Sequence, residues 1–307
     1  MSAVAPPIPV SVIGGYLGAG KTTLVNHLLR HAEGRRLAVL VNDFGELPID
    51  DALIEARDGN LLRLAGGCVC CSFGSDLLGA LQQLGTMRPP PDQVLLECSG
   101  VARPGAVART LTLLPALQRD AVLVLADAET LRERAADRYV GELVQQQLAE
   151  ADLIVLNKCD RIAAHGLQAL QGWLTGVAPQ ARVLPCTQGR LAPELLLGLG
   201  SVPRAAGLAP AHDAARQFAS VSVAFDHAVD AARLAEALAD PALGLLRAKG
   251  LLRDALRGWC VLQQVGARGR IDALPGTAPA QPRLVGIGLR GQLDEDALRR
   301  ALAASRA

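Results

Sequence analysis

Three cysteine thiols crowd into one short segment of the sequence, GGCVCC, as Cys68, Cys70 and Cys71. Thiolates are soft ligands that suit Zn²⁺, Co²⁺ or Cu⁺, and the N-terminus of a helix predicted just after them favours the thiolate form at neutral pH. A structural zinc site normally closes with four protein ligands, often as two separated cysteine pairs, and the sequence holds no second pair. The segment therefore predicts an open, exchangeable metal site of the kind that a metal carrier needs.

Other interpretations of the cysteines stay open. Cys68 and Cys71 have the C-x-x-C spacing of a redox pair, and inert packing is a third interpretation, although the flanking GG and SFG favour an exposed loop. A disulfide is disfavoured because the chain has the features of a cytosolic protein. The other four cysteines lie in or beside apolar runs and are predicted to pack as small hydrophobic residues: Cys98, Cys159, Cys186 and Cys260.

A phosphate loop is predicted at GYLGAGKT, residues 15–22, which fits G-x-x-x-x-G-K-[ST] between an apolar run and a helical pattern. Its glycines let backbone N–H groups converge on phosphate oxygens, Lys21 supplies charge to the β- and γ-phosphates, and Thr22 can bind Mg²⁺. The following helix adds partial positive charge at its N-terminus. The alternative is a chance glycine-rich turn.

A guanine signal lies at NKCD, residues 157–160, directly after the apolar run DLIVL. Guanine presents N1–H and an exocyclic amine on one edge, and a carboxylate can accept hydrogen bonds from both, whereas adenine offers no such pair there. A carboxylate left unpaired by the wrong base is costly. We therefore assign Asn157 and Asp160 to guanine, with Lys158 supporting the loop and packing on the base.

Acidic residues follow two of the predicted strands. Glu97 ends the run QVLLEC, where an acid is expected to hold a Mg²⁺-bound water or the attacking water, and a structural strand-end acid is the alternative. The segment VNDFGELPIDD, residues 41–51, is interpreted as a switch segment that reaches a metal, or alternatively as a solvated loop. Its acids are Asp43, Glu46, Asp50 and Asp51.

These motifs sit in an alternation of apolar runs and helical patterns. Continuous apolar strands indicate a sheet covered on both faces, and alternation with helices indicates parallel βαβ units. The predicted strands are 8–13, 37–42, 93–98, 121–126, 152–157 and 181–186, and clear helices are 21–32 and 140–151. We predict an α/β fold with a doubly wound, mostly parallel sheet, a P-loop GTPase domain, over residues 1–200.

The pattern changes after a Gly-, Pro- and Ala-rich stretch that predicts a linker at 201–215. A smaller α+β C-terminal domain is predicted over 216–307. Its strands are predicted at 218–225, 258–266 and 283–289, and its helices at 229–240 and 293–304.

The bulk composition excludes several classes of protein. The chain has 307 residues, a formal net charge of +1 and 50% hydrophobic residues, which indicates neither a nucleic-acid partner nor a disordered tail. The N-terminus lacks the regions of a signal peptide, and no apolar run reaches membrane-spanning length. We expect a cytoplasmic protein with no membrane and no nucleic-acid partner.

In their order and spacing, seven motifs resemble those of the CobW-like metallochaperone GTPases over nearly the whole chain: GGYLGAGKTTLVNHLL, VNDFGELPIDD, GGCVCC, LLECSGVARP, NKCD, LLRAKG and RLVGIGL. The resemblance implies GTP hydrolysis coupled to binding and delivery of a transition metal, zinc or cobalt, to a client metalloprotein. GTP, Mg²⁺ and Zn²⁺ or Co²⁺ are the implied ligands. Whether the C-terminal domain docks the client or a second protomer of a homodimer stays open.

The resemblance also implies roles for single residues. The implied nucleotide-binding residues are Gly15, Gly18, Ala19, Gly20, Lys21, Thr22, Thr23, Asn157, Lys158 and Asp160. Lys21 and Glu97 are the implied catalytic residues, and Thr22 and Glu97 hold Mg²⁺. The implied ligands of the transition metal are Cys68, Cys70, Cys71 and Glu46. The sequence shows no obvious arginine finger to stabilise charge during hydrolysis, although Arg103 is a candidate, so a low intrinsic rate that a partner must accelerate is expected.

Two rival functions remain at this stage. A small-molecule kinase would use the phosphate loop with Glu97 as a base, would favour ATP, and would make NKCD a coincidence. A GTP-regulated binding protein without a metal role would keep its cysteines as structural residues. Nucleotide preference separates the first rival, and metal content after anaerobic purification separates the second.

Overall fold

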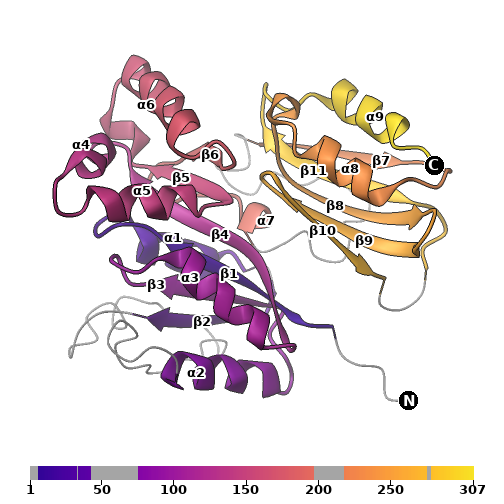
Figure 1. Cartoon of the computed structure of the whole chain (residues 1–307), viewed down its shortest axis with the longest axis horizontal. Helices are drawn as coiled ribbons and strands as arrows, with labels where there is room; N and C mark the ends of the chain where they lie inside the picture. Colours follow the sequence, from indigo (N-terminus) through magenta and orange to yellow (C-terminus); the bar gives the residue numbers. More distant parts are fainter. Residues whose placement is uncertain (1–5, 33, 43–74, 197–217, 275–277) are drawn as a thin grey trace. The chain divides into compact units, whose positions relative to one another are not determined.

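The structure is a computed structural model that describes residues 6–32, 34–42, 75–196, 218–274 and 278–307. The chain divides into two compact units, Met1–Pro193 and Glu194–Ala307 (Figure 1). The predicted linker at 201–215 lies outside the described residues and stays a prediction.

A six-stranded parallel sheet forms the centre of the first unit. Its strands are β1 (Ile8–Gly14), β2 (Leu37–Asn42), β3 (Gln93–Cys98), β4 (Leu117–Asp127), β5 (Leu153–Asn157) and β6 (Arg182–Pro185). They run in the order β2-β3-β1-β4-β5-β6, and every pairing is parallel. The predicted α/β fold is confirmed, and all six predicted strands of this unit are present.

Helices cover both faces of this sheet. They are α1 (Lys21–Arg30), α2 (Ser75–Thr86), α3 (Pro104–Thr110), α4 (Leu131–Ala136), α5 (Gly141–Ala149) and α6 (Ala164–Val177), with a short α7 (Pro193–Leu196) at the boundary of the units. Leucines and alanines of α2, α3, α5 and α6 share one core with alternate strand residues such as Val12, Leu96 and Val124. Helix α1 packs against β3 and buries Leu24, Val25 and Leu28.

The strand order places a switch point at β1. Strand β1 lies between β3 and β4; the chain goes from β1 to β2 on one side and later crosses from β3 to β4 on the other. In open α/β sheets, ligands bind outside the carboxyl ends of the strands at such a point. The loop after β1 is the predicted phosphate loop, so the topology and the motif indicate the same place.

The second unit is an antiparallel sheet with two helices on one face (Figure 1). Its strands are β7 (Phe218–Ala224), β8 (Leu245–Asp254), β9 (Gly258–Val265), β10 (Arg268–Ala273) and β11 (Arg283–Leu289), in the order β10-β9-β8-β11-β7. Helices α8 (Ala231–Leu238) and α9 (Glu295–Ala304) contact each other and bury leucines such as Leu234 and Leu298 against the sheet. The predicted α+β character is confirmed.

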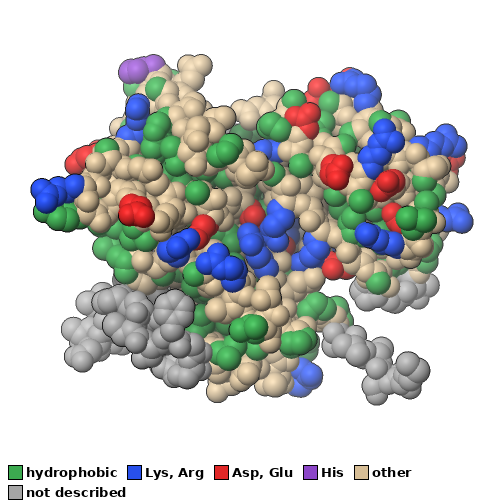
Figure 2. Space-filling model, viewed as in Figure 1, with side chains coloured by type: hydrophobic (Ala, Val, Ile, Leu, Met, Phe, Trp, Pro, Cys, Tyr) green, Lys and Arg blue, Asp and Glu red, His purple; other side chains and the backbone are tan. Residues whose placement is uncertain are grey.

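Acidic and basic side chains are present on both units on the face drawn in Figure 2, which agrees with the net charge of +1. Within the described ranges, no helix is both long and apolar enough to cross a membrane.

Candidate nucleotide site

The phosphate loop joins the end of β1 to the start of α1. Lys21, the first residue of the helix, donates from Nζ to Gly15 O at 3.0 Å. The turn needs glycine at two points: a Cβ on Gly15, at φ +130°, would lie 2.2 Å from Leu125 O, and one on Gly20, at φ +101°, would lie 2.5 Å from the Asn157 amide. A β-carbon at either position would clash with Leu125 or Asn157, so this turn, which leads into the N-terminus of α1, requires glycine.

The other loop residues differ in their surroundings. Ala19 is buried at 2% exposure, and Thr23 is exposed at the start of α1. Gly18 has φ +77°, and a Cβ there would meet nothing within 4 Å. The rim of the loop is therefore open, while its base is tightly packed.

Thr22 and Glu97 meet across the sheet end. Thr22 Oγ1 donates to Glu97 Oε1 at 2.9 Å, although the two residues are 75 positions apart. Glu97 is the penultimate residue of β3 and is only 3% exposed. A hydroxyl and a carboxylate are hard oxygen donors that suit Mg²⁺, so the pair fits the role predicted for these residues.

Asn157 joins the two predicted motifs. Its Nδ2 donates to Ala19 O at 2.9 Å, and its Oδ1 accepts from Gly189 N at 3.0 Å. Asn157 ends β5 and is 3% exposed. One buried side chain thus holds the phosphate loop and the loop after β6 together.

Two further residues of NKCD, Lys158 and Asp160, follow Asn157. Lys158, at φ +61°, places Nζ 2.6 Å from Asp127 Oδ2 at the end of β4. Asp160 lies in a single 3-10 turn, Cys159–Arg161, and is exposed. Its carboxylate is thus accessible to a base, as guanine recognition requires.

Sequence reasoning missed Gly189 and Asp127. The fold brings Gly189 to Asn157 from the loop after β6, where Gln188 and Gly189 have positive φ values of 53° and 63°. A single glycine three positions after the predicted strand 181–186 indicates a turn but does not mark this loop as part of the site. Nothing in the sequence pairs Asp127 with Lys158, because the contact depends on β4 and β5 being neighbours.

Comparison with known proteins agrees with this geometry. Residues 9–185 match the model of the CobW/HypB/UreG nucleotide-binding domain. The chain belongs to this family. Residues 218–306 match a second model, the C-terminal domain of the cobalamin synthesis protein cobW. The resemblance deduced from the motifs is confirmed.

Several relatives of this chain are named zinc chaperones. The zinc chaperone CobW of Pseudomonas aeruginosa is 34% identical over 63% of this chain and 60% of its own length. The zinc chaperone YjiA of Escherichia coli is 32% identical over 80% of this chain and 82% of its own. The crystal structure of Zn(II)-bound YjiA GTPase aligns with 99% of this chain and 100% of that chain at 26% identity and a TM-score of 0.47.

The four cysteines predicted to pack as small hydrophobic residues are free thiols. Cys98, Cys186 and Cys260 are buried, and Cys159 is partly buried. Burial raises the pKa of Cys98 to about 12, and burial followed by the nearby Cys159 raises that of Cys186 to about 12. Burial likewise raises the pKa of Cys159 and Cys260. Protonated, buried thiols are poor nucleophiles and poor ligands, which supports the packing role predicted for them.

The predicted transition-metal ligands Cys68, Cys70, Cys71 and Glu46, and the rest of segment 43–51, lie outside the described residues. Within the ranges that the structure describes, no group of three or more His, Cys, Asp or Glu side chains could hold a metal ion. The metal site therefore stays a prediction from sequence.

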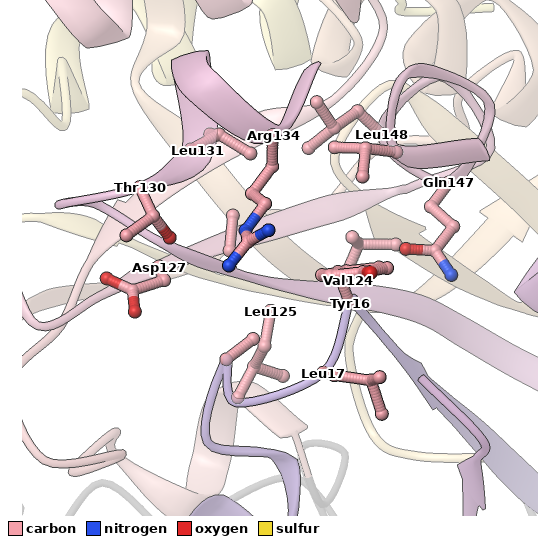
Figure 3. A pocket seen from close by; sticks show the side chains of 13 residues that line it. Tyr16, Leu17, Val124, Leu125, Asp127, Thr130, Leu131, Arg134, Gln147 and Leu148 are labelled. Carbon is pink, nitrogen blue, oxygen red and sulfur yellow. The ribbon is translucent and has the colours of Figure 1, made fainter. Parts of the chain in front are cut away.

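A pocket opens beside the phosphate loop (Figure 3). Tyr16 and Leu17 of the loop line it together with the end of β4 and with side chains of α4 and α5, including Arg134 and Gln147. The Arg134 guanidinium lies 5.8 Å from the Tyr16 ring centroid, which is within range for a cation–π contact. Side chains of the phosphate loop and of α5 therefore line the same pocket.

Proposed function

We propose that this protein is a GTPase that couples its nucleotide state to the binding and delivery of Zn²⁺ to a client protein. The observation that carries the nucleotide half is Asn157 of the guanine motif, whose amide donates to Ala19 O in the phosphate loop and accepts from Gly189 N in the loop after β6. The names of the relatives support the metal half. The GGCVCC segment supplies soft ligands for it.

Lys21, Thr22 and Glu97 are proposed to act on the triphosphate. Lys21 exchanges its bond to Gly15 O for contacts with the β- and γ-phosphates. Thr22 and Glu97 would hold Mg²⁺, which when bound neutralises charge that develops on the phosphates. Glu97, at the carboxyl end of β3, is proposed to orient the attacking water. The low hydrolysis rate remains part of the proposal.

The proposed cargo is Zn²⁺, with Co²⁺ as the second candidate that thiolates suit. Cys68, Cys70, Cys71 and Glu46 are proposed as its ligands. The client metalloprotein is proposed to bind in one nucleotide state and to be released in the other. A homodimer, the linker at 201–215 and a cytoplasmic location belong to the same proposal.

Titration of the reduced protein with Zn²⁺ and Co²⁺ tests the proposal, in three states: without nucleotide, with GDP, and with a non-hydrolysable GTP analogue. We expect tight binding whose affinity changes with the nucleotide, and GTP hydrolysis that Lys21→Ala abolishes. A protein that prefers ATP would support a kinase instead. A protein that hydrolyses GTP and binds neither metal in any state would overturn the chaperone half alone.

A further inference from the structure

The loop that follows Glu97, residues 99–103, is held from the side by α5. Gln147 Nε2 donates to Gly100 O at 3.1 Å and to Ala102 O at 2.7 Å. Gln147 is 1% exposed, so both carbonyl bonds lie in a dry environment. A buried acceptor left without its donor is costly, and this amide therefore fixes the path of the loop.

Glu150, directly after α5, makes a second attachment. Its Oε1 accepts from Arg103 Nε at 3.0 Å and from Nη2 of the same guanidinium, and its Oε2 accepts from Gly105 N at 2.9 Å. Helix α3 begins at Pro104, and its N-cap residue Arg103 makes no side-chain cap. The Glu150 carboxylate thus caps α3 from outside, where negative charge is favourable.

The held loop touches the phosphate loop. A Cβ on Gly100 would lie 2.5 Å from Leu17 Cδ2 and 2.9 Å from Leu17 N, so the two backbones approach as closely as glycine allows. Leu17 and Gln147 also line the same pocket (Figure 3). Any shift of the 99–103 loop would therefore be felt at the phosphate loop, and the reverse holds as well.

We infer that Gln147 and Glu150 are positioning residues for hydrolysis, which set the 99–103 loop against the phosphate loop. The inference rests on the proposed function. Glu97 ends the strand that enters this loop, and α5 leads into β5 and Asn157, so one helix supports both sides of the nucleotide site. Misplacement of a catalytic group by about 1 Å can lower a rate about 10²-fold.

Arg103 was a candidate for stabilising charge on the phosphates, and its ion pair with Glu150 indicates a different role. Its guanidinium is bound by the Glu150 carboxylate, whose side chain is 14% exposed, while that of Arg103 is 47% exposed. Arg103 then acts through the position of the loop, as the partner of Glu150, instead of contacting the phosphates.

Gln147→Met tests the first attachment, because methionine keeps the length of the side chain and removes the donor. We expect kcat for GTP to fall about tenfold or more, by loss of positioning, while GDP affinity stays within about twofold. Gln146→Met is the matched control: the neighbouring amide donates to Glu142 Oε1 at 2.9 Å on the exposed side of α5, and its loss should leave kcat unchanged.

A double-mutant cycle tests the second attachment. Glu150→Gln and Arg103→Met should each lower kcat, and the double variant should fall no further than the worse single one. If Arg103→Met lowers kcat while Glu150→Gln leaves it at the wild-type value, Arg103 acts on the phosphates and the inference for Glu150 is overturned.

Amide hydrogen exchange provides a readout that does not need turnover. Residues 99–106 should exchange faster in GDP-bound Gln147→Met than in wild type or Gln146→Met, and equal rates would overturn the inference. A wild type that hydrolyses GTP no faster than Gln147→Met also overturns it, and leaves the proposed function intact. A wild type that binds GTP without hydrolysing it overturns the proposed function, and the positioning role fails with it.

Discussion

Asn157 bonds to two loops that come from distant parts of the chain. Asn157→Ala leaves Ala19 O and Gly189 N without this partner in a buried site. We expect a loss of about 1–3 kcal/mol in the free energy of unfolding and a weaker affinity for GDP, because the phosphate loop loses its support. Chemical denaturation and nucleotide titration would measure the two effects.

Asn157→Asp is the matched comparison for this prediction. Aspartate keeps the acceptor for Gly189 N but sets a buried carboxylate oxygen against Ala19 O, so we expect it to lower stability and GDP affinity at least as much as alanine does. Wild-type GDP affinity in both variants would show that Asn157 has no part in the nucleotide site.

Asp160 should select the base. Asp160→Asn replaces an acceptor by a donor, and the C2 oxygen of xanthine accepts a hydrogen bond where guanine donates one. We expect GDP affinity to fall and XDP affinity to rise, which competition titrations would show. If wild type binds ADP as tightly as GDP, the guanine assignment is wrong.

Residues that share a motif were easier to predict than residues that share only a contact. Motif spacing identified Lys21, Thr22 and Asn157 as candidates, and its place at the end of an apolar run identified Glu97. The fold brings Thr22 to Glu97 and Asn157 to the phosphate loop. Gly189 and Gln147 carry no such signal, because their contacts exist only once β6 and α5 are packed beside the sheet.

At the scale of elements, Asp254 links the end of β8 to the start of α8. Its Oδ2 accepts from Ala231 N at 2.9 Å, and its Oδ1 accepts from Leu256 N at 3.0 Å and Arg257 N at 2.7 Å. Burial raises the pKa of this carboxyl, but the backbone N–H groups outweigh burial and hold the pKa below its ordinary value of 3.8. The charged carboxylate therefore stabilises the second unit.

We expect Asp254→Asn to lower the free energy of unfolding by about 1–3 kcal/mol at neutral pH. Because the folded pKa is depressed, this stabilisation is present above pH 3.8 and is lost as pH falls below 3.8 toward the folded pKa. The difference in the free energy of unfolding between wild type and Asp254→Asn should therefore become smaller in acid, as chemical denaturation at several pH values would show.

Asp226→Asn is the control, because the Asp226 side chain is fully exposed at 101%, and it should change stability little at any pH. A constant gap between wild type and Asp254→Asn down to pH 2 would contradict the linkage.

Elements of the first unit were predictable because their strands are continuous apolar runs, buried on both faces. Strands β8 and β10 were missed. Arg247, Lys249 and Arg253 interrupt the apolar pattern of β8, and β10 reads RGRIDA at the edge of its sheet. Such strands are specified by pairing with β9 more than by their own composition, and pairing is not visible in a single sequence.

For the whole molecule, the proposed coupling must be reciprocal. If the GTP analogue changes Zn²⁺ affinity by some factor, Zn²⁺ must change the affinity for the analogue by the same factor, typically about 5–150-fold. We expect Cys70→Ala to remove the Zn²⁺ effect and to leave GDP affinity unchanged. Isothermal titration in both orders would measure the two factors.

Cys260→Ala is the matched control for this prediction, because it removes a buried thiol in the second unit and should keep Zn²⁺ affinity. The Co²⁺ complex of wild type should show thiolate-to-metal charge-transfer absorption, which Cys70→Ala alters. If Zn²⁺ affinity is the same with and without the GTP analogue, metal and nucleotide binding are not coupled and the prediction is wrong.

The crowded base and open rim of the phosphate loop also bear on how this sequence can evolve. Positions 15 and 20 have no room for a β-carbon, whereas position 18 has open space and needs only a left-handed backbone, which Asn and Asp adopt more readily than other residues. A saturation library scored by yield of folded protein should therefore retain only glycine at 15 and 20, and should retain Asn and Asp beside glycine at 18. Descendants of this chain can therefore change the residue at position 18, on the rim of the loop, but not the glycines at positions 15 and 20 at its base.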